Sequence, residues 1–94
     1  MNIIINAVKF KADQKLNEFV EDKIQRLVKH SPQVIGAEIT MKLEQDHEHG
    51  NKVVDIRLEI KGNDLFARKQ ASTFEEACVE ACEALKNQLE KIKF

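Results

Sequence analysis

Regular spacings of hydrophobic and polar residues divide the chain into strands and helices. In residues 1–8, Ile3 and Ile5 fall on one face and asparagines on the other, a period of two that predicts a strand. Ile4 interrupts this alternation, which predicts that the strand is covered on both of its faces.

The next segment has the spacing of a helix. Asp13 is a candidate N-cap, since its carboxylate can accept hydrogen bonds from the free N–H groups of a first helical turn. The hydrophobic residues after it recur at helical intervals and form one stripe: Leu16, Phe19, Val20, Ile24, Leu27 and Val28. Ser31-Pro32 ends the predicted helix of residues 14–29, because the residue before a proline is disfavoured in the α region.

Two runs with a period of two follow, and they predict a hairpin. Hydrophobic side chains alternate with polar ones in residues 37–44, and the same pattern returns in residues 54–61. The polar segment 45–51 between them ends in a glycine–asparagine pair, which is typical of a turn. Each strand of the hairpin therefore has one buried and one solvated face. A second such pair turns the chain again, and residues 65–70 are predicted to add a third consecutive strand.

A helix is predicted at the end of the chain. Ser72-Thr73-Phe74-Glu75 has the S-x-x-E form of a capping box, in which the first and last side chains bond free N–H groups of the first turn. One face of this helix is hydrophobic and consists of Phe74, Ala77, Cys78, Ala81, Leu85, Leu89 and Ile92. The order β-α-β-β-β-α predicts an α+β fold, a two-layer sandwich in which both helices pack on one face of a four-stranded sheet.

Length and composition indicate one small folded domain spanning residues 1–94. The chain is 43% hydrophobic and 33% charged, which excludes a disordered protein. No hydrophobic run approaches the ~18 residues that a membrane crossing needs, and the N-terminus lacks the basic region of a signal peptide. Two cysteines cannot form the disulfide framework of a secreted mini-protein, so the prediction is a soluble, reduced, cytoplasmic domain.

The charge balance constrains any role in nucleic-acid binding. Fifteen Lys and Arg residues against sixteen Asp and Glu residues give a formal net charge of −1, and the sequence pI is near 6.3. Proteins that coat nucleic acid indiscriminately are usually strongly basic. Binding of RNA by this chain therefore requires a local basic patch on a neutral body.

Basic residues gather in the C-terminal parts of both predicted helices. On the first helix, Lys23, Arg26 and His30 share a face beside the hydrophobic stripe, with Lys29 close by. The end of the last helix carries Lys86, Lys91 and Lys93. If the two helices lie side by side, their basic halves form one positive strip, whose natural targets are phosphates. The alternative interpretation is an ordinary solvated surface of lysines and glutamates.

Cys78 and Cys82 lie four residues apart on the last helix. A disulfide within one regular helix is geometrically unfavourable, and a zinc site would need further ligands close by. The favoured interpretation is that both are small apolar residues in the helix–sheet interface. Cys82 lies nearer the edge of the hydrophobic stripe and is a candidate for partial reactivity, but no base is obviously placed to activate it.

The remaining candidate sites are weak. His47 and His49 have an H-x-H spacing that can chelate a metal, yet solvated loop residues are the favoured interpretation. His30 follows the first helix, where positive charge suits the helix dipole, and it needs no further role. The sequence contains no G-x-S-x-G, no phosphate-binding glycine loop and no H-E-x-x-H, so neither an enzyme nor a bound cofactor or metal is predicted.

Several local strings, taken with the order of elements, point to a known family. They are Asn2-Ile3-Ile4-Ile5, the run from Leu16 to Lys23 after Asp13, Leu65-Phe66-Ala67, Thr73-Phe74-Glu75-Glu76-Ala77, and the run from Leu85 to Lys91. None is a catalytic signature, so the specificity lies in their combination and spacing. Over essentially the whole chain, they resemble the ribosome hibernation promoting factors, also called the protein Y family.

This resemblance implies a fold similar to the double-stranded-RNA-binding domain and a function on the ribosome. Such proteins bind the small ribosomal subunit in the channel for messenger and transfer RNA, and they silence ribosomes when growth slows. Family members hold ribosomal RNA with basic residues on both helices. The predicted RNA-binding residues are Lys23, Arg26, Lys91 and Lys93, which match such positions, and Lys29 and Lys86, which lie close to them.

The chain departs from the family pattern at two positions of the last helix. Where many relatives carry a lysine and an arginine, it has Ala84 and Asn87. Lys86 lies nearby, but one residue along a helix is about 100° round its axis. Loss of two phosphate contacts would weaken RNA binding by about tenfold or more at moderate salt.

The second domain of longer family members, which pairs ribosomes, is not expected here, since the sequence ends at Phe94. We therefore expect the protein to occupy the subunit without pairing ribosomes by itself, with pairing left to a separate dimerising factor. The alternative function is a protein-interaction module of the same fold with weakened RNA binding, in line with the family's older label of sigma factor modulation. Neither a membrane nor a small-molecule substrate is expected as a partner.

Overall fold

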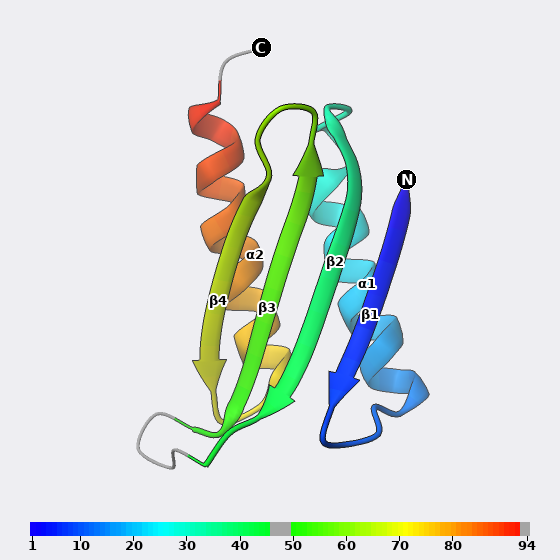
Figure 1. Ribbon diagram of the computed structural model, residues 1–94, viewed down its shortest axis with the longest axis vertical. Coiled ribbons are helices and arrows are strands. Elements are labelled where there is room, and N and C mark those ends of the chain that lie inside the picture. The colour runs from blue at the N-terminus through cyan, green and yellow to red at the C-terminus, as the bar shows by residue number, and fades with distance from the viewer. Residues whose placement is uncertain (46–49, 93–94) are drawn as a thin grey trace.

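A computed structural model describes residues 1–45 and 50–92 of the chain (Figure 1). Its elements are β1 (Asn2–Val8), α1 (Gln14–Val28), β2 (Val34–Leu43), β3 (Lys52–Ile60), β4 (Leu65–Ala71) and α2 (Phe74–Lys91). The predicted order of elements is confirmed, and each boundary lies close to the one expected from the hydrophobic pattern.

The four strands form one mixed sheet in the order β1-β2-β3-β4. β1 runs parallel to β2, with Asn2 opposite Gly36, and the other neighbouring strands are antiparallel. Figure 1 shows α1 and α2 on one face of the sheet, in contact and running in the same direction, so that both helices end near the same edge of the molecule. The predicted two-layer α+β sandwich is confirmed.

The hydrophobic core lies between the helices and the covered face of the sheet. Alternate residues of β2 and β3 supply one wall, among them Ile39, Met41, Ile56 and Leu58, which are fully buried. The predicted stripes of the helices supply the other wall through Val20, Ile24, Phe74, Ala77, Cys78, Ala81, Leu85 and Leu89. Burial of one large aliphatic side chain stabilises the fold by about 1.5–3 kcal/mol, so these contacts fix both helices on the sheet.

β1 differs from the prediction in its burial. Ile3 and Ile5 pack against the core as expected, but the side chain of Ile4 is 45% exposed. The prediction that this strand is covered on both faces was therefore wrong. Because α1 and α2 both lie on the same face of the sheet, the opposite face of β1 meets solvent (Figure 1).

Each helix begins at a polar N-cap. The Asp13 Oδ1 accepts a hydrogen bond from the Leu16 N–H at 2.8 Å, which confirms the predicted cap of α1. For α2 the predicted box began one residue too early. The Thr73 hydroxyl, and not that of Ser72, accepts a hydrogen bond from the Glu76 N–H at 3.1 Å.

Two capping boxes overlap at the start of α2, because Ser72 and Thr73 each have a glutamate three positions later. Packing of the helix decides between them. With Thr73 as the cap, Phe74 becomes the first helical residue, and its ring stacks on that of Phe10 with the centroids 4.6 Å apart. An aromatic contact of this kind adds about 0.5–1.5 kcal/mol beyond simple burial, which favours the later start.

The two neighbouring hydroxyls are expected to differ in their effect on stability. Thr73→Ala removes the acceptor for the Glu76 N–H and should lower the free energy of unfolding by about 1 kcal/mol. Ser72→Ala is expected to change it by less than about 0.5 kcal/mol, since Ser72 is exposed and does not cap the helix. Urea titrations followed by circular dichroism measure both values. A larger loss for Ser72→Ala would contradict the observed cap.

The open face of the sheet carries an ion-pair network around Asp55 of β3. Asp55 is 9% exposed, and its carboxylate accepts hydrogen bonds from the Arg68 Nε at 2.6 Å and Nη2 at 2.9 Å. The Lys42 ammonium lies 3.4 Å from the same carboxylate. Burial raises the pKa of Asp55, but the hydrogen bonds and charge of Arg68, followed by those of Lys42, outweigh burial and hold the pKa below its ordinary value of 3.8.

This network predicts a loss of stability in acid. Because the pKa of Asp55 is lower in the folded chain than in the unfolded chain, the ionised carboxylate stabilises the fold above about pH 4. That stabilisation is lost as the pH falls through the lowered pKa. Asp55→Asn should lower the free energy of unfolding by about 1.5–3 kcal/mol at pH 7 and make its fall below about pH 4 shallower. Urea titrations at several pH values check this, and a fall as steep as that of the wild type would contradict it.

Candidate nucleic-acid interface

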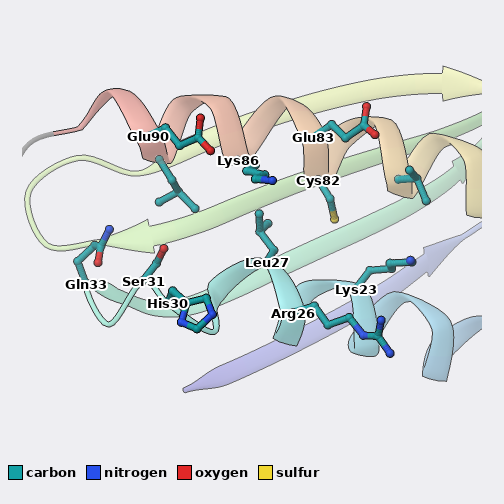
Figure 2. Close-up of a pocket in the computed structure, with 12 residues that line it drawn as sticks. Lys23, Arg26, Leu27, His30, Ser31, Gln33, Cys82, Glu83, Lys86 and Glu90 are labelled. Carbon is teal, nitrogen blue, oxygen red and sulfur yellow. The ribbon is translucent and has the colours of Figure 1, made fainter.

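A groove runs between the C-terminal halves of α1 and α2 (Figure 2). Its volume is about 680 Å³. The residues that line it are Lys23, Arg26, Leu27, His30, Ser31, Gln33, Val79, Cys82, Glu83, Lys86, Leu89 and Glu90. Because the two helices run in the same direction, basic residues from the later part of each helix meet here.

The α1 side of the groove is positively charged. Lys23, Arg26 and His30 follow one another at intervals of three and four residues, so they lie on one side of α1 and its following turn. The Lys23 ammonium lies 5.4 Å from the ring centroid of Phe19, a cation–π contact within the same helix. The Arg26 Nε lies 3.0 Å from the Asp22 carboxylate, and the two side chains are 73% and 54% exposed. Because the pair is so exposed, it adds little stability and leaves the guanidinium accessible to another anion.

The α2 side of the groove carries charges of both signs. Lys86 lies between Glu83 and Glu90 along this side, and all three residues are exposed (Figure 2). Leu27 of α1 is half-buried and Leu89 of α2 is buried, so the base of the groove is apolar. An anion entering the groove therefore meets cations mainly from α1, with Lys86 opposite.

The structure brings together three of the predicted RNA-binding residues. Lys23, Arg26 and Lys86 line the groove from its two sides. Lys29 and Lys91 are exposed but do not line it. Lys91 follows Lys86 by five residues, which places it about 140° further round the helix axis. Of the predicted RNA-binding residues that the structure describes, Lys23, Arg26 and Lys86 therefore share the groove, whereas Lys29 and Lys91 lie outside it.

Ala84 and Asn87, the two departures from the family pattern, do not line the groove. Ala84 is half-buried against the core, and Asn87 is exposed. His30, which the sequence pattern grouped with Lys23 and Arg26 on one face of the first helix but left out of the predicted RNA-binding residues, also lines the groove. Its spacing of four residues from Arg26 is the signal that links it to this surface.

The two cysteines differ in exposure and in acidity. Both are free thiols; Cys78 is fully buried, as its predicted packing role requires, whereas Cys82 is half-buried and lines the groove. Interaction between the two neighbouring side chains lowers the pKa of Cys82 and raises that of Cys78. Burial opposes the lowering at Cys82, while the charge of Lys23 adds to it. The sequence alone did not place the charge of Lys23 near Cys82, because the two residues belong to different helices.

Several other candidates receive no support from the residues that the structure describes. Lys93, His47 and His49 lie outside those residues. Within 1–45 and 50–92, no group of three or more His, Cys, Asp and Glu side chains is placed to hold a metal ion. Within the same ranges, neither helix combines the length and apolar character that crossing a membrane needs.

Comparisons with known proteins give the same fold. The family model for sigma 54 modulation protein / S30EA ribosomal protein matches residues 3–93. A comparison with curated proteins finds no match. Among solved structures, a ribosomal subunit interface protein from Coxiella burnetii matches with a TM-score of 0.86 at 19% sequence identity, covering 97% of this chain and 96% of that one. The N-terminal domain of Thermus thermophilus Protein Y matches with a TM-score of 0.83 at 17% identity, covering 99% of this chain and 100% of that one.

Proposed function

Since the chain belongs to the sigma 54 modulation protein / S30EA ribosomal protein family, we propose that it binds the small ribosomal subunit and inhibits translation. The family consists of ribosome-binding factors and not of enzymes. The observation that carries the proposal is the groove between α1 and α2, in which Lys23, Arg26 and Lys86 present their charges together. The name of the Coxiella burnetii protein, a ribosomal subunit interface protein, supports the same partner.

Inhibition in this proposal is steric. Phosphates of ribosomal RNA bind at the groove, where Lys23 and Arg26 neutralise them; such backbone contacts position a protein without reading sequence. The folded body, which measures 40 × 26 × 19 Å, then occupies the channel that messenger and transfer RNA need. Because the net charge of the protein is −1, attraction to phosphate is confined to the groove, and shape fit within the channel supplies the remaining specificity. The site of action is the cytoplasm, and a separate ribosome-dimerising factor is a further candidate partner.

Co-sedimentation of the purified protein with small ribosomal subunits tests this proposal. Saturable binding is expected at low salt, and three phosphate contacts predict that log affinity falls against log salt with a slope of about −2 to −3. Large subunits run under the same conditions are the control for non-specific binding to ribosomal RNA. The proposal would be overturned if no binding occurs at low salt, or if the affinity does not change with salt concentration.

A second candidate function, binding of a protein segment, is favoured by the composition of the groove. Glu83 and Glu90 oppose phosphate, and the apolar base formed by Leu27 and Leu89 suits a peptide side chain. A basic peptide would pair with the two carboxylates, whereas RNA would be repelled by them.

Removing the two carboxylates distinguishes the candidates. If phosphate is the ligand, the Glu83→Gln and Glu90→Gln double variant should bind small subunits roughly threefold to tenfold more tightly, because two repulsive charges are gone. Glu75→Gln with Glu76→Gln, two acidic residues at the opposite end of α2, is the matched control and should have little effect. Weaker binding to subunits by the groove variant would contradict the RNA interface and favour the peptide.

A further inference from the structure

The groove contains a nucleophile that phosphate binding does not use. Figure 2 shows the Cys82 side chain directed from α2 toward α1, into the space that Lys23 borders from the other side. One turn earlier on α2, Cys78 is fully buried and points to the core. Cys82 is therefore the member of this thiol pair that a dissolved reagent can reach.

We propose that Cys82 is a thiol-modification site that reacts with small anionic disulfides, and that the attached group blocks the groove. The first part, the modification, rests on the position of Cys82 in the groove and on the residues around it, and not on the function proposed above. The second part, loss of ribosome binding after modification, rests on the function proposed above.

Two neighbours favour the reactive form of Cys82. The thiolate is the nucleophile in disulfide exchange, and nearby cations and hydrogen bonds stabilise it. The neighbouring Cys78 side chain and the charge of Lys23 both lower the pKa of Cys82, against the opposing effect of burial.

The charges of the groove favour an anionic reagent. Among the lining residues, Lys23, Arg26 and Lys86 are cationic and Glu83 and Glu90 are anionic, so the balance is positive. A positively charged cleft raises the local concentration of anions and the rate at which they arrive. The volume of about 680 Å³ lies within the range of small-molecule pockets, so an attached organic group fits.

The reaction is a thiol–disulfide exchange. Cys82 gives its proton to solvent, and its thiolate attacks one sulfur of the reagent R–S–S–R. A bond between the Cys82 sulfur and that sulfur forms, the original S–S bond breaks, and R–S⁻ leaves with the electron pair. The Cys82 sulfur is oxidised and the leaving sulfur is reduced. Cys78 is poorly placed to displace the adduct, because residues four apart in a regular helix make a strained disulfide.

The full chain treated with 5,5′-dithiobis(2-nitrobenzoate), an anionic aromatic disulfide, tests the site. One equivalent of thionitrobenzoate should be released rapidly, and peptide mass mapping should place the adduct on Cys82. Cys82→Ser and Cys82→Ala should both lose the rapid phase, whereas Cys78→Ser should keep one reactive thiol. Lys23→Gln should slow the reaction roughly threefold to tenfold, with a smaller effect on the neutral reagent 2,2′-dithiodipyridine.

Lys29→Gln is the matched control, since Lys29 belongs to the same segment as Lys23 but does not line the groove. Equal rates for the two lysine variants would overturn the role of the groove. A rate for Cys82 no faster than in the urea-unfolded chain would overturn the modification site itself.

Co-sedimentation of the labelled protein with small subunits tests the second part. Labelled wild type should lose binding, while Cys82→Ser exposed to the same reagent should keep it. Labelled protein that still binds would overturn the blocking effect. If the unlabelled protein does not bind subunits at all, the function proposed above is wrong. The exchange rates still test the modification site in that case.

Discussion

Replacing Lys23 and Arg26 together by alanine is expected to weaken binding to small ribosomal subunits by about 10- to 100-fold at moderate salt. These residues form the positive side of the groove, and once they are gone, Lys86 is the one lysine or arginine left among the lining residues, between two carboxylates on α2. Each lost phosphate contact also removes a counterion-release contribution, so the salt slope should become shallower by about 1.5. Co-sedimentation of wild type and variant across one salt series measures both quantities.

The matched control is the double variant Lys29→Ala and Lys91→Ala, which removes the same total charge outside the groove, one lysine at the end of α1 and one at the end of α2. Its affinity is expected to fall less than about threefold, because the lost charges act on the phosphates only at a distance. Equal losses in the two double variants would show that RNA contacts spread over the exposed helix surfaces, and the groove would lose its assigned role. Circular dichroism confirms that each variant is folded before binding is compared.

Truncating Leu85 to alanine should produce the largest loss of stability among the changes considered. Leu85 is fully buried on α2, where it belongs to the cluster that joins this helix to the sheet. Leu→Ala changes at such positions lower the free energy of unfolding by about 2–5 kcal/mol, since the contacts of the removed atoms are lost and a cavity remains. In a domain of this size, that is a large part of the total. Urea unfolding followed by circular dichroism measures the change.

Ile35→Ala provides the comparison for this prediction. Its side chain is 59% exposed, so its loss should change the free energy of unfolding by less than about 0.5 kcal/mol. Leu85→Met, which conserves volume, should lower it by less than about 1.5 kcal/mol. A Leu85→Ala variant as stable as Ile35→Ala would mean that α2 is not held on the sheet by this contact, and the spacing of the groove would need another explanation.

The elements of the fold were predictable because most of them are half-buried. The alternation through β2 and β3 and the stripe of α1 each contain one face that meets the core and one that meets water, and such contrast is visible in sequence. The prediction failed at Ile4 and at Ser72, where the pattern allowed two answers. Coverage of β1 depends on where the helices pack, and the start of α2 depends on the contact between Phe74 and Phe10.

The candidate site was predictable in part for the same reason. The sequence placed Lys23 and Arg26 on one side of α1, since both belong to a single helix with a known period. Which side of α2 faces them depends on the rotation of α2 about its own axis, which its contacts with β3 and β4 also fix. The structure shows that Lys86 shares the groove and Lys91 does not. The neighbourhood of Cys82 depends on the same packing and was hidden for that reason.

The parallel pairing of β1 with β2 has a consequence for the order in which the chain folds. Asn2 pairs with Gly36, so the whole of α1 must be synthesised before β1 meets its partner. β2, β3 and β4 instead pair between consecutive segments, and contacts that are local in the chain form faster. During translation β1 therefore emerges ahead of its partner and docks late. We expect its run of isoleucines to be the segment of the nascent chain that most needs protection from aggregation.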